Sequence, residues 1–266
     1  MEVLQRRVLS TLYSDSTTGI PNHVLSSRGY FFDNPRRYDS DDDLAWSIPP
    51  QNGSASLSSD CYDWGSRHSS FTVHTNSNEQ KRVQQYAVDV TLDPDTANPA
   101  LILSDDGKQV NCGNVWKNLT DNPKRFSPSP CVFGKQSLSS GRFYFEVQVK
   151  EKTDWVLGVA RESINRKGKI TLSPQNGFWT IWLRNGNEYE ALDDPPVDLS
   201  LKSRPQKVGV FVDYEEGLVS FYDVDAAALI YSFTGCSFTE KLYPNFCPFM
   251  NHGGRNSAPL IICPVN

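Results

Sequence analysis

The sequence predicts an all-β protein built as a sandwich of two antiparallel sheets, and three observations predict it. Residues 143–150 alternate between apolar and polar side chains, with Phe143, Phe145, Val147 and Val149 on one face. Short apolar runs of this kind recur at regular spacing and are separated by turns rich in Gly and Pro. No amphipathic helix of any length interrupts them. This combination is typical of two sheets that each bury one face against the other.

The individual strands follow from the same pattern. Residues 143–150 predict a strand with one buried and one exposed face. Residues 208–213 and 218–222 flank a tight turn in which Gly217 can take the positive φ of a hairpin loop. We expect further strands at residues 87–92, 100–103, 155–160, 178–183, 229–233 and 260–263.

The composition of the chain changes near residue 87. Of residues 1–86, 15 are Ser and only 16 are Leu, Ile, Val or Phe, about 19%, whereas 49 of the following 180 residues belong to these four apolar types, about 27%. A segment so poor in apolar residues cannot readily build a core. We therefore predict a disordered tail rich in Ser and Asp over residues 1–78 and a folded domain over 87–266. Residues 79–86 lack Gly and Pro and consist mostly of good helix formers, which predicts a short linker helix.

Charge and cysteine usage exclude several classes of protein. The chain has 26 Lys and Arg against 31 Asp and Glu, a net charge of −5, so the basic stripe of a nucleic-acid binder is not expected. No apolar run approaches the roughly 18 residues of a membrane span. The polar N-terminus resembles no signal peptide, so we expect a cytoplasmic protein without a membrane anchor. The six cysteines do not have zinc-ligand spacing, which predicts reduced thiols and no metal site.

Catalytic constellations are also not expected. The chain has no G-x-S-x-G elbow, no phosphate-binding loop, and a single His, His252, after residue 86. A cysteine nucleophile paired with His252 remains an alternative, although a buried structural thiol is favoured. Asp213 and Glu215 lie two residues apart and resemble an acid pair, but a structural role in the hairpin is favoured. We expect no active site and no cofactor.

Several motifs occur in the order and spacing of one protein family. They lie at residues 90–97, 101–107, 140–147, 155–160, 177–183, 212–215 and 258–260. In these motifs the chain resembles the PRY-SPRY (B30.2) domain of tripartite-motif (TRIM) proteins, with the PRY part at 87–137 and the SPRY part at 138–266. The resemblance implies a concanavalin-like sandwich that binds other proteins through loops at one edge. Residues 1–78 have neither the Cys and His ligands of a RING or B-box nor the heptads of a coiled coil.

Residues 178–184 provide the first candidates for partner binding. Alternation places Trp179 on the core face and Trp182 with Arg184 on the opposite, outward face. Trp and Arg are the residue types that dominate binding hot spots. The resemblance supports this role, because Trp182 aligns with an aromatic residue that family members use in their partner-binding groove. The alternative is that Trp182 lies under a covering loop.

The resemblance carries over two further positions of that groove, Val156 and Met250, and the loop that holds Met250 adds two more candidates. Val156 stands where the family often has Asp, directly after the Trp of its Trp-x-Leu-Gly-Val motif. The loop before the last strand, residues 248–255, brings Met250, Asn251 and His252. Val156 and Met250 favour apolar, adaptable contacts. Variable loops are expected around the groove at residues 150–154, 162–169, 185–188 and 193–204.

The predicted function is recognition of a protein partner by a monomeric, non-enzymatic module, in a process linked to ubiquitin or innate immunity. One alternative is that the chain is a fragment or splice form of a TRIM E3 ubiquitin ligase and supplies substrate recognition. The other alternative is a lectin-like domain that binds glycans, because the implied fold is concanavalin-like. The sequence offers no clear cluster of calcium ligands in support of the lectin.

Overall fold

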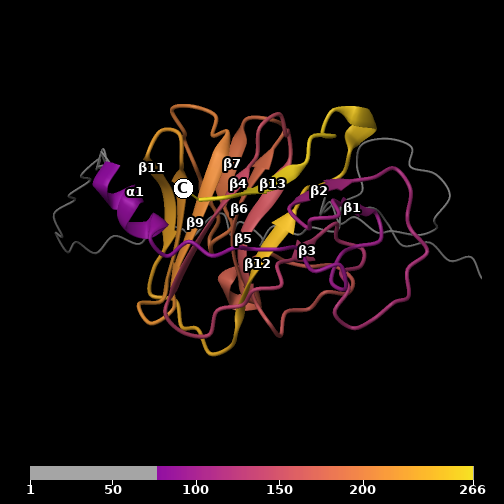
Figure 1. The fold of residues 1–266 in the computed structure, drawn as a ribbon, viewed down its shortest axis with the longest axis horizontal. Helices are drawn as coiled ribbons and strands as arrows, with labels where there is room; N and C mark the ends of the chain where they lie inside the picture. The colour runs from indigo at the N-terminus through magenta and orange to yellow at the C-terminus, as the bar shows by residue number, and fades with distance from the viewer. Residues whose placement is uncertain (1–76, 266) are drawn as a thin grey trace, which may run out of the picture.

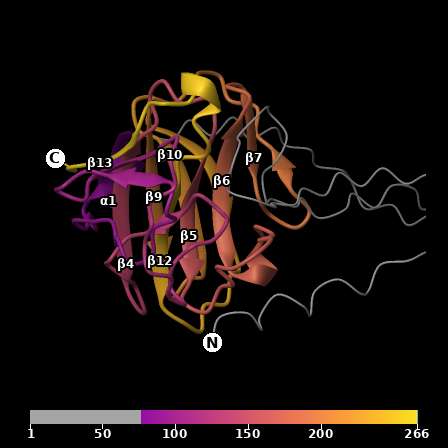
Figure 2. The ribbon, with the colours of Figure 1, turned by 90° about the vertical axis from the view of Figure 1, so that its right-hand side faces the viewer.

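The computed structural model describes residues 77–265, which form two antiparallel sheets packed face to face with one short helix against the outside of one sheet (Figures 1 and 2). In spatial order, the seven-stranded sheet consists of β1 (Leu101–Leu103), β2 (Gln109–Cys112), β13 (Leu260–Cys263), β4 (Arg142–Gln148), β9 (Lys207–Asp213), β10 (Leu218–Asp223) and β11 (Ala228–Phe233). The six-stranded sheet consists of β3 (Val132–Phe133), β12 (Leu242–Cys247), β5 (Trp155–Arg161), β6 (Phe178–Arg184), β7 (Glu188–Ala191) and β8 (Val197–Asp198). The predicted antiparallel sandwich is confirmed.

The main core lies between the two sheets. Phe143 and Phe145 of β4 point into it from one sheet, and Trp179 and Ile181 of β6 point into it from the other. These are the faces that the alternation of apolar residues predicts, because successive side chains of a strand point to opposite sides. Burial of this continuous apolar layer is the principal force that holds the sheets together.

The second face of β4 corrects one prediction. We expected this face to be exposed, but Tyr144 and Glu146 are 0% and 3% exposed. The helix α1 (Ser77–Gln84) covers it, and Val83 of the helix packs with Tyr144. The Glu146 carboxylate accepts hydrogen bonds from Gln84 Nε2 and from the Tyr144 hydroxyl, both at 3.0 Å. β4 is therefore buried on both sides although its residues alternate between apolar and polar, because the polar groups on its second face are hydrogen-bonded to one another and to the helix.

The helix was predicted at residues 79–86 and begins and ends two residues earlier. It is anchored by the Gln80 side chain, which donates from Nε2 to the Val224 carbonyl at 3.0 Å. The tail predicted for residues 1–78 falls almost entirely outside the described residues, so its disorder remains a prediction.

The hairpin between β9 and β10 forms as predicted, with Leu218 opposite Asp213. Gly217 has a φ of 59°, the left-handed region that glycine adopts without strain. A Cβ atom at this position would also lie 2.0 Å from the Cys236 carbonyl oxygen. The turn therefore requires glycine for both its conformation and its packing.

The strand predicted at residues 87–92 forms only two isolated bridges, Ala87 to Tyr144 and Leu92 to Gly134. Conversely, the sequence did not predict β2, β3, β7, β8 and β12. In β12 the reason is Pro244, which normally argues against a strand because it lacks an N–H. The structure accommodates Pro244 because β3 pairs only with Asn245 and Phe246 on that side, while the Pro244 carbonyl accepts from the Gly134 N–H at 2.9 Å.

The outer face of the six-stranded sheet carries a second apolar cluster. Val156, Phe178 and Trp182 of this sheet pack there with residues of the flanking loops, namely Phe126, Cys131, Ile164, Ile170, Leu172, Leu192 and Phe249. The sheet is thus covered on both faces, by the other sheet on one side and by its own long connections on the other.

Two cysteines of this cluster contradict the prediction of reduced thiols. Cys131, next to β3, and Cys247, at the end of β12, form a disulfide between residues 116 positions apart. The sequence could not show the pair, because only the pairing of β3 with β12 brings the two side chains together. Cys112, Cys236 and Cys263 are free thiols, as expected.

Candidate functional site

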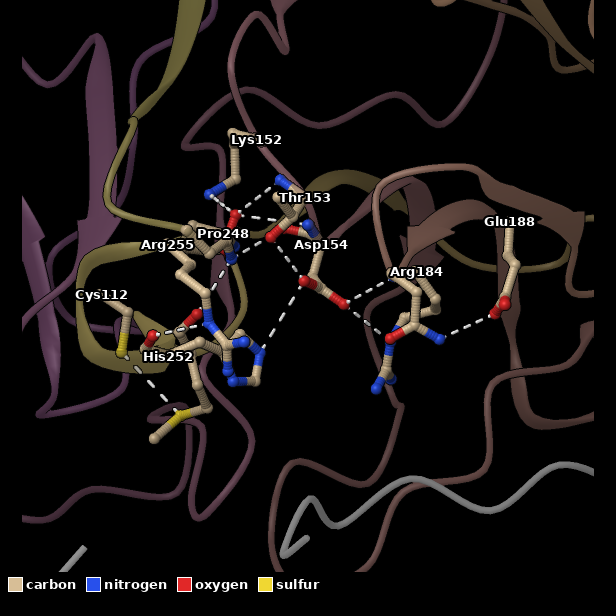
Figure 3. Close-up of polar contacts among 12 residues, drawn as sticks. Cys112, Lys152, Thr153, Asp154, Arg184, Glu188, Pro248, His252 and Arg255 are labelled. Atoms are coloured by element: carbon tan, nitrogen blue, oxygen red, sulfur yellow. Dashed lines mark hydrogen bonds and ion pairs between the residues drawn. The ribbon is translucent and has the colours of Figure 1, made fainter. Parts of the chain in front are cut away.

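Three chain segments meet at one end of the sandwich, where Figure 3 shows a network of polar side chains. The connection between β4 and β5 brings Lys152, Thr153 and Asp154, and the end of β6 brings Arg184. The third segment, residues 248–259 between β12 and β13, contains the short 3-10 helix η2 (His252–Gly254). Loops from both sheets therefore build this part of the surface.

Asp154 holds the end of β6 in place. Its carboxylate is 7% exposed and accepts from Arg184 Nε at 3.1 Å and from the Asn185 N–H at 3.2 Å. The other oxygen accepts from the Thr153 hydroxyl at 2.7 Å and lies 3.8 Å from His252 Nε2. Figure 3 shows Arg184 on one side of this carboxylate and His252 on the other. A buried charge needs such partners, and here they fix the position of the arginine.

Asn256 joins two of these segments, the β4–β5 connection and the loop before β13. Its side chain is fully buried, and its Oδ1 accepts from Lys152 Nζ at 3.1 Å and from the Thr153 N–H at 3.0 Å. Its Nδ2 lies 2.9–3.1 Å from the carbonyl oxygens of Asp154, Pro248 and Met250. One amide group thus satisfies the backbone of two loops that lie about a hundred residues apart in the sequence.

Lys152 is a buried cation beneath this surface. It is 0% exposed, and its Nζ donates to Asn256 and to the Ala258 carbonyl at 3.0 Å. Burial lowers the pKa of Lys152 to about 8, although the negative charge of Asp154 acts in the opposite direction. Burial likewise raises the pKa of the nearby Cys112 thiol to about 11. The ordered loops therefore bury one ammonium group, and its removal from water costs free energy.

We expect Lys152→Met to stabilise the domain at pH 7 by about 1 kcal/mol or more, because it removes a buried charge and keeps the volume. The folded-state pKa of about 8 lies below the unfolded value. At pH values between these two pKa values the unfolded chain binds more protons than the folded chain. The contribution of Lys152 to the free energy of unfolding therefore rises with pH. The cost of the charge is complete at pH 7 and is lost as pH rises toward roughly 10.4.

Urea unfolding of wild type and variant at pH 7 and pH 10 measures this effect. The advantage of K152M should shrink by about 2–3 kcal/mol between the two pH values, which reverses its sign if it is only about 1 kcal/mol at pH 7. The Cys112 thiol contributes a pH dependence of opposite sign and is electrostatically coupled to Lys152, so both proteins are compared in a Cys112→Ala background. An advantage that is independent of pH would contradict a charged Lys152 in the fold.

Arg184 forms the exposed part of the site. Its guanidinium lies 4.2 Å from the ring centre of Phe249 and 5.4 Å from that of Trp182. Both distances are within the range of cation–π attraction. The arginine side chain is 26% exposed, so it presents a charged group on an aromatic support to the solvent. This is a rigid arrangement, because Asp154 fixes the guanidinium from the other side.

The six predicted binding residues fall into two layers. Arg184, Met250, Asn251 and His252 are partly exposed and form what we call the rim. Val156 and Trp182 are 0% and 7% exposed and lie in the apolar cluster below. The outward direction of Trp182 was predicted correctly, but its exposure was not, because the flanking loops cover that face. Trp182 supports the rim from beneath, which is the alternative that the sequence left open.

Sequence reasoning missed the residues that hold the rim and the surface beside it. Phe249 adopts a φ of 61°, rare for a bulky residue, and so turns its buried ring beneath Arg184. On the other side, Asn251 Nδ2 donates to Asn114 Oδ1 at 3.0 Å, which joins the rim to the loop after β2. Val115 of that loop is 76% exposed. An exposed apolar residue in a loop is a signal for binding, but only the structure places this loop beside the rim.

The residues that the sequence offered as catalytic candidates take part in structural contacts. Cys131 and Cys247 are bonded to each other, and a Cys112 thiol with a pKa of about 11 stays protonated at neutral pH. Asp213 accepts from Arg142 Nε at 2.5 Å and Glu215 accepts from the Gly141 N–H at 2.9 Å, so both acids serve the hairpin. Within residues 77–265 no group of His, Cys, Asp and Glu side chains has the geometry of a metal site. In the same range, no helix is long and apolar enough to cross a bilayer.

Comparison with known proteins gives matches to two family models. Residues 90–138 match the SPRY-associated domain (PRY), and residues 142–260 match the SPRY domain. The chain is 50% identical over 182 residues to human Pyrin, covering 68% of this chain and 23% of Pyrin. It is 47% identical over 187 residues to the mouse E3 ubiquitin-protein ligase TRIM21, covering 70% of this chain and 40% of that protein. The chain thus spans well under half the length of these relatives.

Solved structures agree on the fold. The crystal structure of the TRIM65 PSpry domain superposes with a TM-score of 0.57 at 19% identity, covering 70% of this chain and 94% of that domain. A stonustoxin structure gives a TM-score of 0.58 at 24% identity, covering 67% of this chain and 29% of the toxin chain. The family models, the relatives and the fold agree: residues 90–260 form a PRY-SPRY domain of the TRIM type.

Proposed function

We propose that this domain binds a protein partner through the rim, the surface formed by Arg184, Met250, Asn251 and His252. A SPRY domain of the TRIM type is a non-catalytic interaction module, and the proposal assigns that role to one surface of this chain. The observation that carries it is the partly exposed Arg184, stacked on Phe249 and held by the Asp154 carboxylate. Arginine on an aromatic support loses little side-chain freedom on binding, which is why such residues dominate interface energetics.

The chemistry of the rim fits a partner surface with both acidic and apolar groups. Arg184 offers a cation with planar donors, and Met250, in the loop before β13, is a flexible apolar side chain that adapts to different shapes. His252 and Asn251 add polar groups at the edge. We propose that the residues below, Trp182 and Val156, hold this surface in shape without contacting the partner.

We further propose that this recognition serves ubiquitin transfer and that the domain itself catalyses no reaction. The support is the 47% identity to a relative whose name describes an E3 ubiquitin-protein ligase. In that arrangement the domain selects the substrate, and another part of the assembly carries the ligase activity.

The proposal predicts that Arg184→Ala weakens partner binding by about 30-fold, equivalent to about 2 kcal/mol for the loss of a central anchor. Quantitative capture of cell proteins by the full chain, followed by titration of the captured partner, measures the change. Lys81→Ala, an exposed change in α1 away from the rim, is the matched control and should bind like wild type. Met250→Ala should weaken binding more mildly.

Thermal unfolding of each variant shows whether the domain is intact. If R184A folds and captures the same partner with unchanged affinity, the rim is not the binding surface. Equal losses in R184A and K81A would also contradict the proposal, since only one of these side chains belongs to the rim.

A further inference from the structure

The rim continues into an apolar surface that the family resemblance did not mark. Val115, Trp116 and Leu119, in the loop after β2, are 76%, 38% and 41% exposed, and we call them the ledge. The loop contacts the rim through the hydrogen bond from Asn251 to Asn114. It is also joined to the rim below the surface, where Cys112 Sγ lies 4.0 Å from Met250 Sδ. Rim and ledge therefore form one continuous surface at the end of the sandwich.

This surface has an excess of positive charge. Residues 113–125 contain two exposed lysines, Lys117 and Lys124, and a single acid, Asp121, whereas Arg125 is 8% exposed and donates to backbone carbonyls. Asp121 is already paired with Lys167 at 2.5 Å. Residues 248–256 add Arg255 and contain no acid, and the Asp154 carboxylate is turned inward and 7% exposed. An occupant of this surface should therefore carry several negative charges next to apolar side chains.

One segment of the same chain has that composition. Residues 39–43 contain four Asp, and residues 38–66 contain no Lys or Arg. Directly after the acids, Leu44, Trp46 and Ile48 alternate with small residues, so an extended backbone places all three on one side. Pro49 and Pro50 follow and favour an extended conformation in the residues before them. The segment therefore offers an acidic end and an apolar edge to a basic and apolar surface.

The segment is also within reach. It is separated from α1 by residues 49–76, a connection that spans up to about 90 Å when extended and roughly 30 Å as a flexible chain. Figure 1 shows η2, in yellow, at the end of the domain away from α1. A compact domain of this size is about 40 Å across, so the connection can pass along it without strain.

We propose that residues 39–48 of the chain itself dock on the rim and ledge, with Trp46 as the apolar anchor and the four aspartates facing the cations. The inference rests on the proposed function, because it places an internal competitor on the same surface. A tethered segment has an effective concentration on the order of 1 mM. With an intrinsic Kd of about 0.1 mM it occupies the surface about 90% of the time and weakens any competing ligand about tenfold.

The test uses the full chain and a fluorescent synthetic peptide with the sequence of residues 38–50. The peptide should bind the Trp46→Ala chain about tenfold more tightly than the wild-type chain, because residues 39–48 of the variant no longer occupy the rim and ledge. Trp64→Ala, which removes another tryptophan of the same N-terminal region, is the matched control and should behave like wild type. Val115→Asp, placed in W46A at a 76% exposed position, should abolish peptide binding without unfolding the domain.

The dependence of peptide binding on salt and on the charge of the peptide is a second, independent test. Binding of the peptide to W46A should weaken as salt is raised, and a peptide with Asp41, Asp42 and Asp43 replaced by Lys should not bind. Equal affinity of the peptide for wild type and W46A would overturn the proposal, as would no binding to either chain. The same holds if W64A gains as much affinity as W46A.

Partner capture separates this inference from the proposed function. Wild type should capture less of a rim-binding partner than W46A does, whereas R184A should lose the partner in both backgrounds. If R184A loses the partner but W46A captures no more than wild type, the rim binds a partner and the internal competitor does not exist. If R184A keeps the partner while the peptide binds as expected, the segment docks on a surface that the partner does not use.

Discussion

Trp182→Ala is expected to lower the free energy of unfolding by about 3–5 kcal/mol, as much as Trp179→Ala on the opposite face of the same strand. Both indoles are at least nine-tenths buried, Trp179 between the sheets and Trp182 against Val156 and Phe249. Each truncation leaves a cavity that a sheet held by neighbouring strands cannot close. For a domain of this size, the loss corresponds to roughly 6–20 °C in Tm.

Urea unfolding at pH 7 measures both losses directly. Val197→Ala, at a 37% exposed position in the edge strand β8, is the control and should change stability by less than about 1 kcal/mol. Trp182→Ala should also weaken partner binding, but only as far as the rim above it is disturbed. A W182A protein that unfolds like wild type would show that this indole belongs to the surface after all.

Asn256→Ala is the second large change, with an expected loss of about 3–5 kcal/mol. It removes the acceptor of the buried Lys152 ammonium, and it leaves the Thr153 N–H and the Met250 carbonyl without their side-chain partner. A buried group without its hydrogen bond costs about 1–3 kcal/mol, and more when it is charged. The loss should exceed that of any exposed hydrogen bond in the same loops.

Asn251→Ala provides the matched comparison, because it removes a partly exposed amide from the same loop and only one side-chain hydrogen bond, to Asn114. Its cost should be about 1 kcal/mol or less. Thermal unfolding of the two variants side by side distinguishes a structural junction from a loop contact. Similar melting temperatures for N256A and N251A would mean that Asn256 does not hold the β4–β5 connection and the loop before β13 together.

The alternation of residues 178–184 shows how far sequence reasoning reaches. It predicts correctly that Trp179 and Trp182 point to opposite faces of β6, because that follows from the geometry of any strand. It cannot predict what lies above Trp182, since the covering residues come from loops tens of residues away, such as Phe126 and Phe249. Local pattern determines direction, and the packing of distant segments determines exposure.

The residues of the candidate site divide in the same way, into those that a local pattern marks and those that only the packing of distant segments reveals. Alternation and the resemblance mark Arg184 and the loop that holds the other rim residues, but Lys152, Asp154 and Asn256 carry no periodic or compositional signal in the sequence. Their roles arise from long-range pairing across about a hundred residues. The disulfide between Cys131 and Cys247 is of the same kind, because neither cysteine reveals its partner until β3 and β12 are paired. Such groups can be found only after the fold is known.

The position of β13 has a consequence for how the domain is made. This strand, residues 260–263, lies between β2 and β4 and is the only link in the seven-stranded sheet between β1–β2 and the remaining strands of that sheet within the described chain. During synthesis the N-terminal pair β1–β2 emerges about 150 residues before the strand that attaches it to the sheet. Until then its edge is unpaired, and unpaired edges invite aggregation. The seven-stranded sheet is therefore completed only after translation has reached its last strand, so the edge of β2 stays exposed for most of the synthesis of the domain.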